Sequence, residues 1–254
     1  MSGFVHFGIW LPLWALIAAL IAVPDHRATT PSTRGVALVE LFTSEGCSSC
    51  PPADAQLERI VREAEQTGRP VFGLSFHVDY WDRLGWKDRF SSATFTSRQA
   101  QYADRFGLTS LYTPQMIVNG TSEFVGSNSS AAKLAIDRAL SQASSITPEL
   151  TATTNGLDVT IHCTSPHAPT GATLFVAWVE SQVVSSPNRG ENEGRKLRHA
   201  NVVRDLRSIE LTSSFDGNVR LQRPELRDGS VIAWIQARES GPVLGAASVR
   251  IEGK

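Results

Sequence analysis

The sequence predicts an α/β unit followed by an all-β unit, on three observations. Between residues 35 and 146, short apolar runs alternate with segments whose apolar residues recur at helical spacing. From residue 147 onward, strand-like segments follow one another and turn residues separate them. A Cys-x-x-Cys stands where the first strand meets the first helix. We therefore expect a central mixed sheet flanked by helices, and then a β-sandwich.

The elements of the first unit follow from these periodicities in the order β-α-β-α-β-β-α. The prolines at 51 and 52 suit the first turn of a helix, and glycines at 68 and 107 suit helix ends. Asn119-Gly120 is a strong hairpin signal. The expected strands cover residues 36–42, 71–76, 114–118 and 122–125, and the expected helices cover 51–67, 93–106 and 130–143.

The second unit, residues 147–254, reads as strands only. After an Asn155-Gly156 turn, the apolar residues from Leu157 to Cys163 alternate strictly with polar ones. No segment of helical period and useful length follows. Further strand-like runs cover residues 173–184, 207–214, 218–222, 230–239 and 244–252, a spacing typical of a β-sandwich.

Composition excludes several classes of protein. The chain has 254 residues, a formal net charge of −1 and three cysteines. A charge this close to zero gives no sign of nucleic-acid binding. Three cysteines are too few for a scaffold built on disulfides, so a Cys-x-x-Cys is a site rather than a framework. We predict no cofactor.

Residues 1–23 are predicted to be a signal peptide or a retained N-terminal anchor. The apolar run over residues 7–23 is shorter than the roughly 20 residues of a comfortable membrane span. However, no Lys or Arg precedes the run and no A-x-A site follows it, so both interpretations stay open. Both predict an exported chain, either periplasmic or secreted or anchored to the inner membrane. Residues 24–34 then form a linker.

Cys47 and Cys50 allow a redox-active disulfide, a metal site or a structural bridge. Their place at the start of a helix favours a thiolate, which is the nucleophile in disulfide exchange. We expect Cys47 to be the more exposed, attacking thiol and Cys50 the resolving one. In the metal alternative, the two cysteines and His77 hold copper or another soft metal.

The phrases VELFTSEGCSSCPPAD, LSFHVDYWDRLGWKDRFSS and YTPQMIVNG identify a resemblance. The first unit resembles a thioredoxin-like domain, and with GENEGRKLRHANVVR the whole chain is similar to an exported bacterial thioredoxin-like family of uncharacterised function. The resemblance implies a thioredoxin-like fold and a thiol–disulfide oxidoreductase. Its substrates would be protein thiols or disulfides, and a separate redox partner would restore the cysteine pair.

The resemblance also implies roles for three further residues. A cis Thr113–Pro114 bond would face the disulfide and leave the backbone of Thr113 open to a substrate peptide. Glu40 would lie beneath Cys50 as a buried proton acceptor, because burial raises the pKa of a carboxyl group. Here Glu40 is one residue further from the first cysteine than in the usual pattern, and a partly exposed strand residue is the alternative.

Several other residues are candidates with two interpretations each. His77 and Asp79 share a strand face and are either a base with its orienting carboxylate or the hydrogen-bonded end of a strand. Residues 77–92, HVDYWDRLGWKDRFSS, form an aromatic-rich insert after the second strand. Its Trp81 and Trp86, with Tyr80 and Phe90, form either an apolar rim for substrate or the core of the insert. Cys163 is expected to be buried and inert. The basic run is a partner patch or a solvated hairpin, and it comprises Arg189, Arg195, Lys196, Arg198, His199, Arg204 and Arg207.

Overall fold

The computed structural model describes residues 1, 3, 26–27, 35–165 and 167–253. The predicted signal peptide or anchor over residues 1–23 lies almost wholly outside these residues, as does most of the predicted linker. Among the described residues, no helix combines the length and apolar character needed to cross a bilayer.

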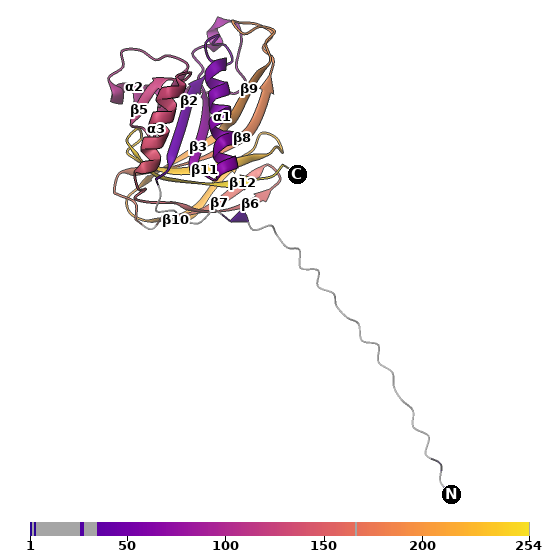
Figure 1. Cartoon of the computed structure of the whole chain (residues 1–254). Helices are drawn as coiled ribbons and strands as arrows, with labels where there is room; N and C mark the ends of the chain where they lie inside the picture. Colours follow the sequence, from indigo (N-terminus) through magenta and orange to yellow (C-terminus); the bar gives the residue numbers. More distant parts are fainter. Residues whose placement is uncertain (2, 4–25, 28–34, 166, 254) are drawn as a thin grey trace.

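Two sheets carry the fold (Figure 1). The larger has eight strands in the order β12-β11-β8-β9-β3-β2-β4-β5, and the smaller has four in the order β1-β6-β7-β10. The strands of the larger sheet are β2 (Ala37–Thr43), β3 (Val71–His77), β4 (Gln115–Val118), β5 (Ser122–Val125), β8 (Ala172–Ser185), β9 (Leu197–Leu211), β11 (Gly229–Ala237) and β12 (Val243–Ile251). Those of the smaller sheet are β1 (His26–Arg27), β6 (Glu149–Asn155), β7 (Asp158–Ser165) and β10 (Phe215–Gln222).

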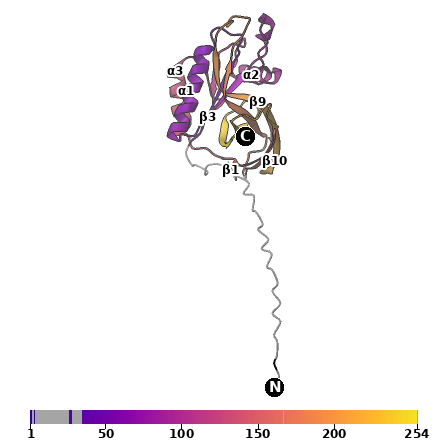
Figure 2. The same ribbon diagram turned by 90° about the vertical axis from the view of Figure 1, so that its right-hand side faces the viewer.

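The three predicted helices are present within two residues of their expected bounds. They are α1 (Pro51–Thr67), α2 (Ala93–Phe106) and α3 (Ser129–Ser141), and a short 3-10 turn, η1 (Asp82–Leu84), lies in the insert. Gly68 and Gly107 end α1 and α2 at φ 64° and 66°, a conformation that glycine adopts without strain. Figure 2 shows α1 and α3 on one side of the sheet and α2 on the other.

The alternation of strand β2 decides which side chains meet which helix. Val39 and Leu41 pack with α1 and α3, whereas Leu38 and Phe42 pack on the opposite face with side chains of α2. Glu40 shares the face of Leu38 and Phe42 and is fully buried there. The face of β2 that carries Glu40 is therefore not the face that α1 covers.

The second unit consists of strands, as predicted, but it shares a sheet with the first. Strand β9 pairs in parallel with β3 at Ser75 and Val202, so β8, β9, β11 and β12 continue the sheet of the α/β unit. The core continues too, because Phe175 and Trp234 stack within the cluster that contains the α2 side chains. The two predicted units are thus joined by backbone pairing as well as by packing.

A sandwich is present between the smaller sheet and the distal half of the larger one. Its core includes Ile161 and Cys163 of β7 and Trp178 of β8, together with side chains of β11 and β12. His26–Arg27, inside the predicted linker, pairs with β6. The structure is a strand-rich α/β fold with additional β structure.

Candidate functional site

The Cys-x-x-Cys forms a disulfide at the start of α1. The Cα atoms of Cys47 and Cys50 are 5.4 Å apart, and Cys50 is the residue that caps the helix. The next two residues are prolines without an N–H, and the N–H groups of Ala53 and Asp54 bond to the carbonyl of Cys50. The helix dipole, rather than free N–H donors, is therefore what favours a negative charge on these sulfurs.

Both cysteines are fully buried, at 0% exposure. The expectation of a more exposed Cys47 is therefore wrong for this structure. The surface nearest to that residue consists of Ser48 and Ser49, which are both exposed. The hydroxyl of Ser49 lies 3.4 Å from the sulfur of Cys47 and is the polar group that a thiolate there would meet.

The Thr113–Pro114 segment lies beside this loop, and its peptide bond is cis, as expected. The hydroxyl of Ser49 donates to the carbonyl of Thr113 at 3.5 Å. Trp81 donates its indole N–H to the hydroxyl of Thr113 at 2.8 Å. Trp81 is partly exposed, and this hydrogen bond places it beside the Thr113–Pro114 segment.

The tip of the β8–β9 hairpin covers the loop from the other side. We call residues 187–196 the hairpin tip. Within it Asn192 is fully buried and donates its side-chain amide to the carbonyls of Glu45 and Cys47, at 2.9 and 2.8 Å. The backbone N–H of Ser48 donates to the carboxylate of Glu191 at 3.0 Å. The second unit therefore holds the Cys-x-x-Cys loop in place.

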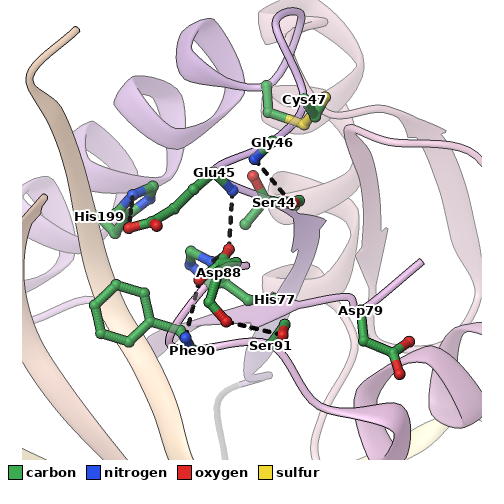
Figure 3. Close-up of polar contacts among 12 residues, drawn as sticks. Ser44, Glu45, Gly46, Cys47, His77, Asp79, Asp88, Phe90, Ser91 and His199 are labelled. Carbon is green, nitrogen blue, oxygen red and sulfur yellow. Dashed lines mark hydrogen bonds and ion pairs between the residues drawn. A yellow bond between two sulfur atoms is a disulfide. The ribbon is translucent and has the colours of Figure 1, made fainter. Parts of the chain in front are cut away.

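The basic run is split by the structure. Its residues at 189, 195, 196 and 198 are exposed, as a solvated hairpin requires, but His199 is buried. The imidazole of His199 lies between two carboxylates that flank the Cys-x-x-Cys in sequence. Its Nδ1 is 3.6 Å from Asp54 Oδ2, and its Nε2 is 4.0 Å from Glu45 Oε1. Figure 3 shows the side chain of Glu45 reaching from the loop toward His199.

His77 lies next to His199, with ring centroids 4.7 Å apart. Its Nδ1 bonds to Asp88 Oδ2 at 2.6 Å, and Asp88 also accepts the backbone N–H groups of Glu45 and Phe90. Burial disfavours the charged imidazole, but the Asp88 carboxylate outweighs this and raises the pKa of His77. The pKa of Asp88 is lowered, because His77 and the two N–H donors outweigh the effect of burial.

We call Glu45, Asp54, His77, Asp88 and His199 the acid–histidine array. All five side chains are buried. The two carboxylates nearest to the cysteines are further anchored. The hydroxyl of Thr43 donates to Asp54 at 2.9 Å, and the indole N–H of Trp86 donates to Glu45 at 2.7 Å. The second predicted tryptophan thus serves the array rather than the disulfide.

Asp79 does not join His77. Its carboxylate accepts the hydroxyl of Thr96 at 2.6 Å, and its backbone N–H donates to the same hydroxyl, which ties the end of β3 to α2. Figure 3 places Asp79 apart from the array. The predicted pair of His77 and Asp79 is therefore not formed, and Asp88 of the insert takes the place of the orienting carboxylate.

No three His, Cys, Asp or Glu side chains among the described residues are arranged to hold a metal ion. The predicted metal set of Cys47, Cys50 and His77 is engaged otherwise. The two sulfurs are bonded to each other, and one ring nitrogen of His77 is bonded to Asp88.

Glu40 belongs to a different network. Its carboxylate binds Arg98 of α2 through two contacts, at 2.6 and 3.0 Å, and accepts the hydroxyl of Tyr102. Arg98 also donates to Gln236 of β11 at 3.0 Å. Because Glu40 faces α2 and not α1, it is not beneath Cys50, and the expectation that it receives the proton of Cys50 has no geometric support.

Cys163 is buried and free, as expected. Its neighbours in the sandwich core are apolar, and burial raises the pKa of its thiol to about 12. A thiol with so little thiolate is a poor nucleophile near neutral pH.

Comparison with known proteins assigns the chain to a family. Residues 38–236 match the family described as "Protein of unknown function (DUF1223)". The chain belongs to the DUF1223 family. A crystal structure of a protein from Agrobacterium tumefaciens is similar, with a TM-score of 0.61 and 28% sequence identity over 88% of this chain and 97% of that one.

HBP35 of Porphyromonas gingivalis matches with a TM-score of 0.58 and 15% identity, over 86% of this chain and 76% of that chain, a likeness of fold alone. No curated protein matches this sequence. The residues matched by the DUF1223 family include the Cys-x-x-Cys loop, the hairpin tip and every member of the acid–histidine array.

Proposed function

We propose that this member of the DUF1223 family is an exported thiol–disulfide oxidoreductase whose residues 35–146 form a thioredoxin-like domain. Its substrates are protein thiols or disulfides, and a separate redox partner restores the Cys47–Cys50 pair. The observation that carries the proposal is the disulfide at the start of α1, where the helix dipole stabilises a departing or attacking thiolate.

The neighbourhood of the loop supports the same chemistry. Ser49 is exposed and lies 3.4 Å from the sulfur of Cys47, so its hydroxyl can donate to a thiolate there. Thr113 lies on the other side of Ser49. In the proposed complex, a substrate peptide in extended conformation lies along Thr113 and Pro114 with its sulfur over Cys47.

The exchange proceeds through one mixed disulfide. When the pair is oxidised, a substrate thiolate attacks the sulfur of Cys47, the Cys47–Cys50 bond breaks, and Cys50 leaves as a thiolate that takes up a proton. A second substrate thiol then loses its proton and attacks the substrate sulfur of the mixed disulfide. The substrate disulfide forms, Cys47 leaves as a thiolate, and the pair has gained two electrons. The same steps in reverse reduce a substrate disulfide.

Two single substitutions test the proposal in the full chain. Cys47→Ser should abolish both the reduction of insulin disulfides and the oxidation of a dithiol peptide. Cys50→Ser should accumulate a mixed disulfide when it is mixed with a peptide disulfide, because the Cys47 thiolate attacks that disulfide and releases one peptide thiol; the product is seen as a mass increase that dithiothreitol removes. Cys163→Ala is the matched control and should keep full activity. Activity retained in Cys47→Ser would refute the assignment.

One observation favours a second candidate, a structural disulfide without exchange activity, because both cysteines are fully buried in the oxidised chain. The reduction potential of the pair separates the two. A structural disulfide in an exported protein resists reduction, with a potential below about −300 mV, whereas catalytic pairs lie between about −270 and −120 mV. A potential in the upper range together with peptide trapping supports the oxidoreductase.

A further inference from the structure

His199 occupies an unusual place for a buried imidazole. It lies between Asp54 and Glu45, at 3.6 and 4.0 Å, yet neither of its nitrogens has a hydrogen-bond partner among the described residues. The Oε1 of Glu45 and the Nε2 of His77 are equally without partners there. Buried polar atoms are nearly always hydrogen-bonded, because leaving them unpaired costs free energy. Four such atoms in one cluster therefore call for an explanation.

A proton bound at His199 would explain the unpaired atoms. Neutral imidazole carries one N–H and one lone pair, and neither has a partner at His199. Protonated imidazole carries two N–H groups, and these point toward two carboxylates that need only a small approach to accept them. The added charge also compensates Glu45 and Asp54, the two buried carboxylates that face the two ring nitrogens.

The charged groups around His199 also favour its protonation. The array contains three carboxylates and two imidazoles, and Asp88 already pairs with His77. Two guanidinium groups, those of Arg89 and Arg204, lie 4.6 and 4.9 Å from the ring centre of Phe90, and the Phe90 ring centre lies 6.2 Å from that of His199. Arg204 also binds Glu180, and three other charged groups of the insert and the hairpin tip have partners outside the array: Glu191 with Ser48, Arg195 with Asn192 and Asp82 with Ser91.

We propose that the acid–histidine array is a proton-binding site, with His199 as the group that takes the proton, and that its occupancy is coupled to the redox state of Cys47 and Cys50. The coupling rests on the proposed oxidoreductase function. It acts through space, because Glu45 precedes Cys47 by two residues and Asp54 follows Cys50 by one helical turn. His199 is a positioning residue for charge and not a catalytic residue.

The coupled reaction balances as follows. A substrate dithiol gives two electrons to the disulfide and is itself oxidised to a disulfide, releasing two protons. At a pH where Cys47 is ionised, one of these protons goes to Cys50, and the pair becomes a thiolate and a thiol. The array binds the second proton. Without His199, the new negative charge would lie next to uncompensated carboxylates, and the thiolate would be less stable.

The test uses Cys50→Ser in the full chain, so that Cys47 is the thiol measured. We follow its ionisation by thiolate absorbance near 240 nm and by the rate of iodoacetamide labelling at Cys47 between pH 4 and 9. Adding His199→Asn should lower labelling about tenfold near pH 6, since a rise of about one unit in the pKa of the thiol lowers the thiolate fraction by that factor. Adding Glu45→Gln should raise labelling by a similar factor.

The opposite signs separate charge from damage. A loosened loop would expose Cys47 and speed labelling in both variants, whereas a misfolded loop would slow it in both. Equal pH profiles in all three proteins, or shifts of the same sign, would overturn the proposal. Labelling does not require catalysis, so a chain that fails to exchange disulfides with peptides would refute the proposed function and still report the coupling.

A second measurement avoids substitution of His199 altogether. Imidazole nitrogen shifts of His199 in the otherwise native chain, recorded by NMR through a pH titration, report its protonation directly. We expect its titration midpoint to lie at higher pH in the reduced than in the oxidised chain, by about one pH unit for a tenfold effect. Identical midpoints in the two redox states would overturn the proposal.

Discussion

Asn192 is the residue whose removal should free the Cys-x-x-Cys loop. Its side-chain amide donates to the carbonyls of Glu45 and Cys47 from within the hairpin tip, and all three residues are buried. Asn192→Ala deletes both donors and leaves the two carbonyls without them. At about 1 kcal/mol of net stabilisation per hydrogen bond, the closed loop loses about 2 kcal/mol relative to open forms.

This loss has a direct kinetic consequence. Both sulfurs are at 0% exposure, so a small reductant reaches them only when the loop opens. If opening is fast relative to reduction, the observed rate follows the open population. A shift of about 2 kcal/mol raises that population about 30-fold. We therefore expect dithiothreitol to reduce the disulfide of Asn192→Ala about 30 times faster than that of the native chain.

The assay quenches the reaction at intervals with a maleimide and counts modified thiols by mass spectrometry. Asn188→Ala is the matched control, because Asn188 lies in the same hairpin tip and is exposed. It should be reduced at the native rate. If Asn192→Ala unfolds at lower denaturant concentration but its disulfide is reduced no faster than in the control, the hairpin tip does not limit access to the cysteines.

Three further predictions follow from buried groups. Glu40→Gln should destabilise the fold by about 3–5 kcal/mol, because Arg98 loses its buried counter-ion. Mixed disulfides should nevertheless be released at the native rate. Slower release would show that Glu40 does take part in disulfide exchange. The stabilisation from Asp88 and His77 requires Asp88 ionised and His77 charged. Because folding raises the pKa of His77, its contribution to the free energy of unfolding is complete below about pH 6.5 and is lost as the pH rises through the pKa of His77 in the folded chain. Because folding lowers the pKa of Asp88, its contribution is present above about pH 3.8 and is lost as the pH falls through the pKa of Asp88 in the folded chain. Urea unfolding of Asp88→Asn should therefore differ most from the native chain between those limits, and a pH-independent difference would contradict the pairing. Cys163→Ala should cost roughly 1–2 kcal/mol of packing and leave the reduction potential unchanged; a changed potential would show that Cys163 takes part in exchange.

Local patterns sufficed for the helices and most strands of residues 35–146. The prolines at 51 and 52, the glycines at 68 and 107, and apolar residues at helical spacing are signals contained within a few residues, and the structure keeps them. The strands after residue 147 were equally visible in their alternation. The sequence did not show which strands pair with one another, because the pairing of Ser75 with Val202 joins segments that share no local signal.

In the candidate site, too, local features could be predicted from the sequence and long-range contacts could not. The Cys-x-x-Cys and its neighbour Thr113 could be placed from the sequence, whereas the acid–histidine array could not, since its members come from four separate segments. Glu40 was misassigned because a buried carboxylate needs a partner, and nothing near Glu40 in sequence identifies Arg98. One signal was overlooked: Leu197 and His199 alternate with exposed Arg198, which marks His199 as inward-facing.

The parallel pairing of β9 with β3 also has a consequence in time. Synthesis runs from the N-terminus, so β3 exists as an unprotected sheet edge until Val202 has been made. At about 5–20 residues per second, the intervening stretch takes roughly 6–25 s. For most of that interval the Cys-x-x-Cys loop has been made but Asn192 and His199 have not. The two cysteines of a nascent chain are therefore uncovered, and the hairpin tip can close over their loop only after residues 187–196 have been made.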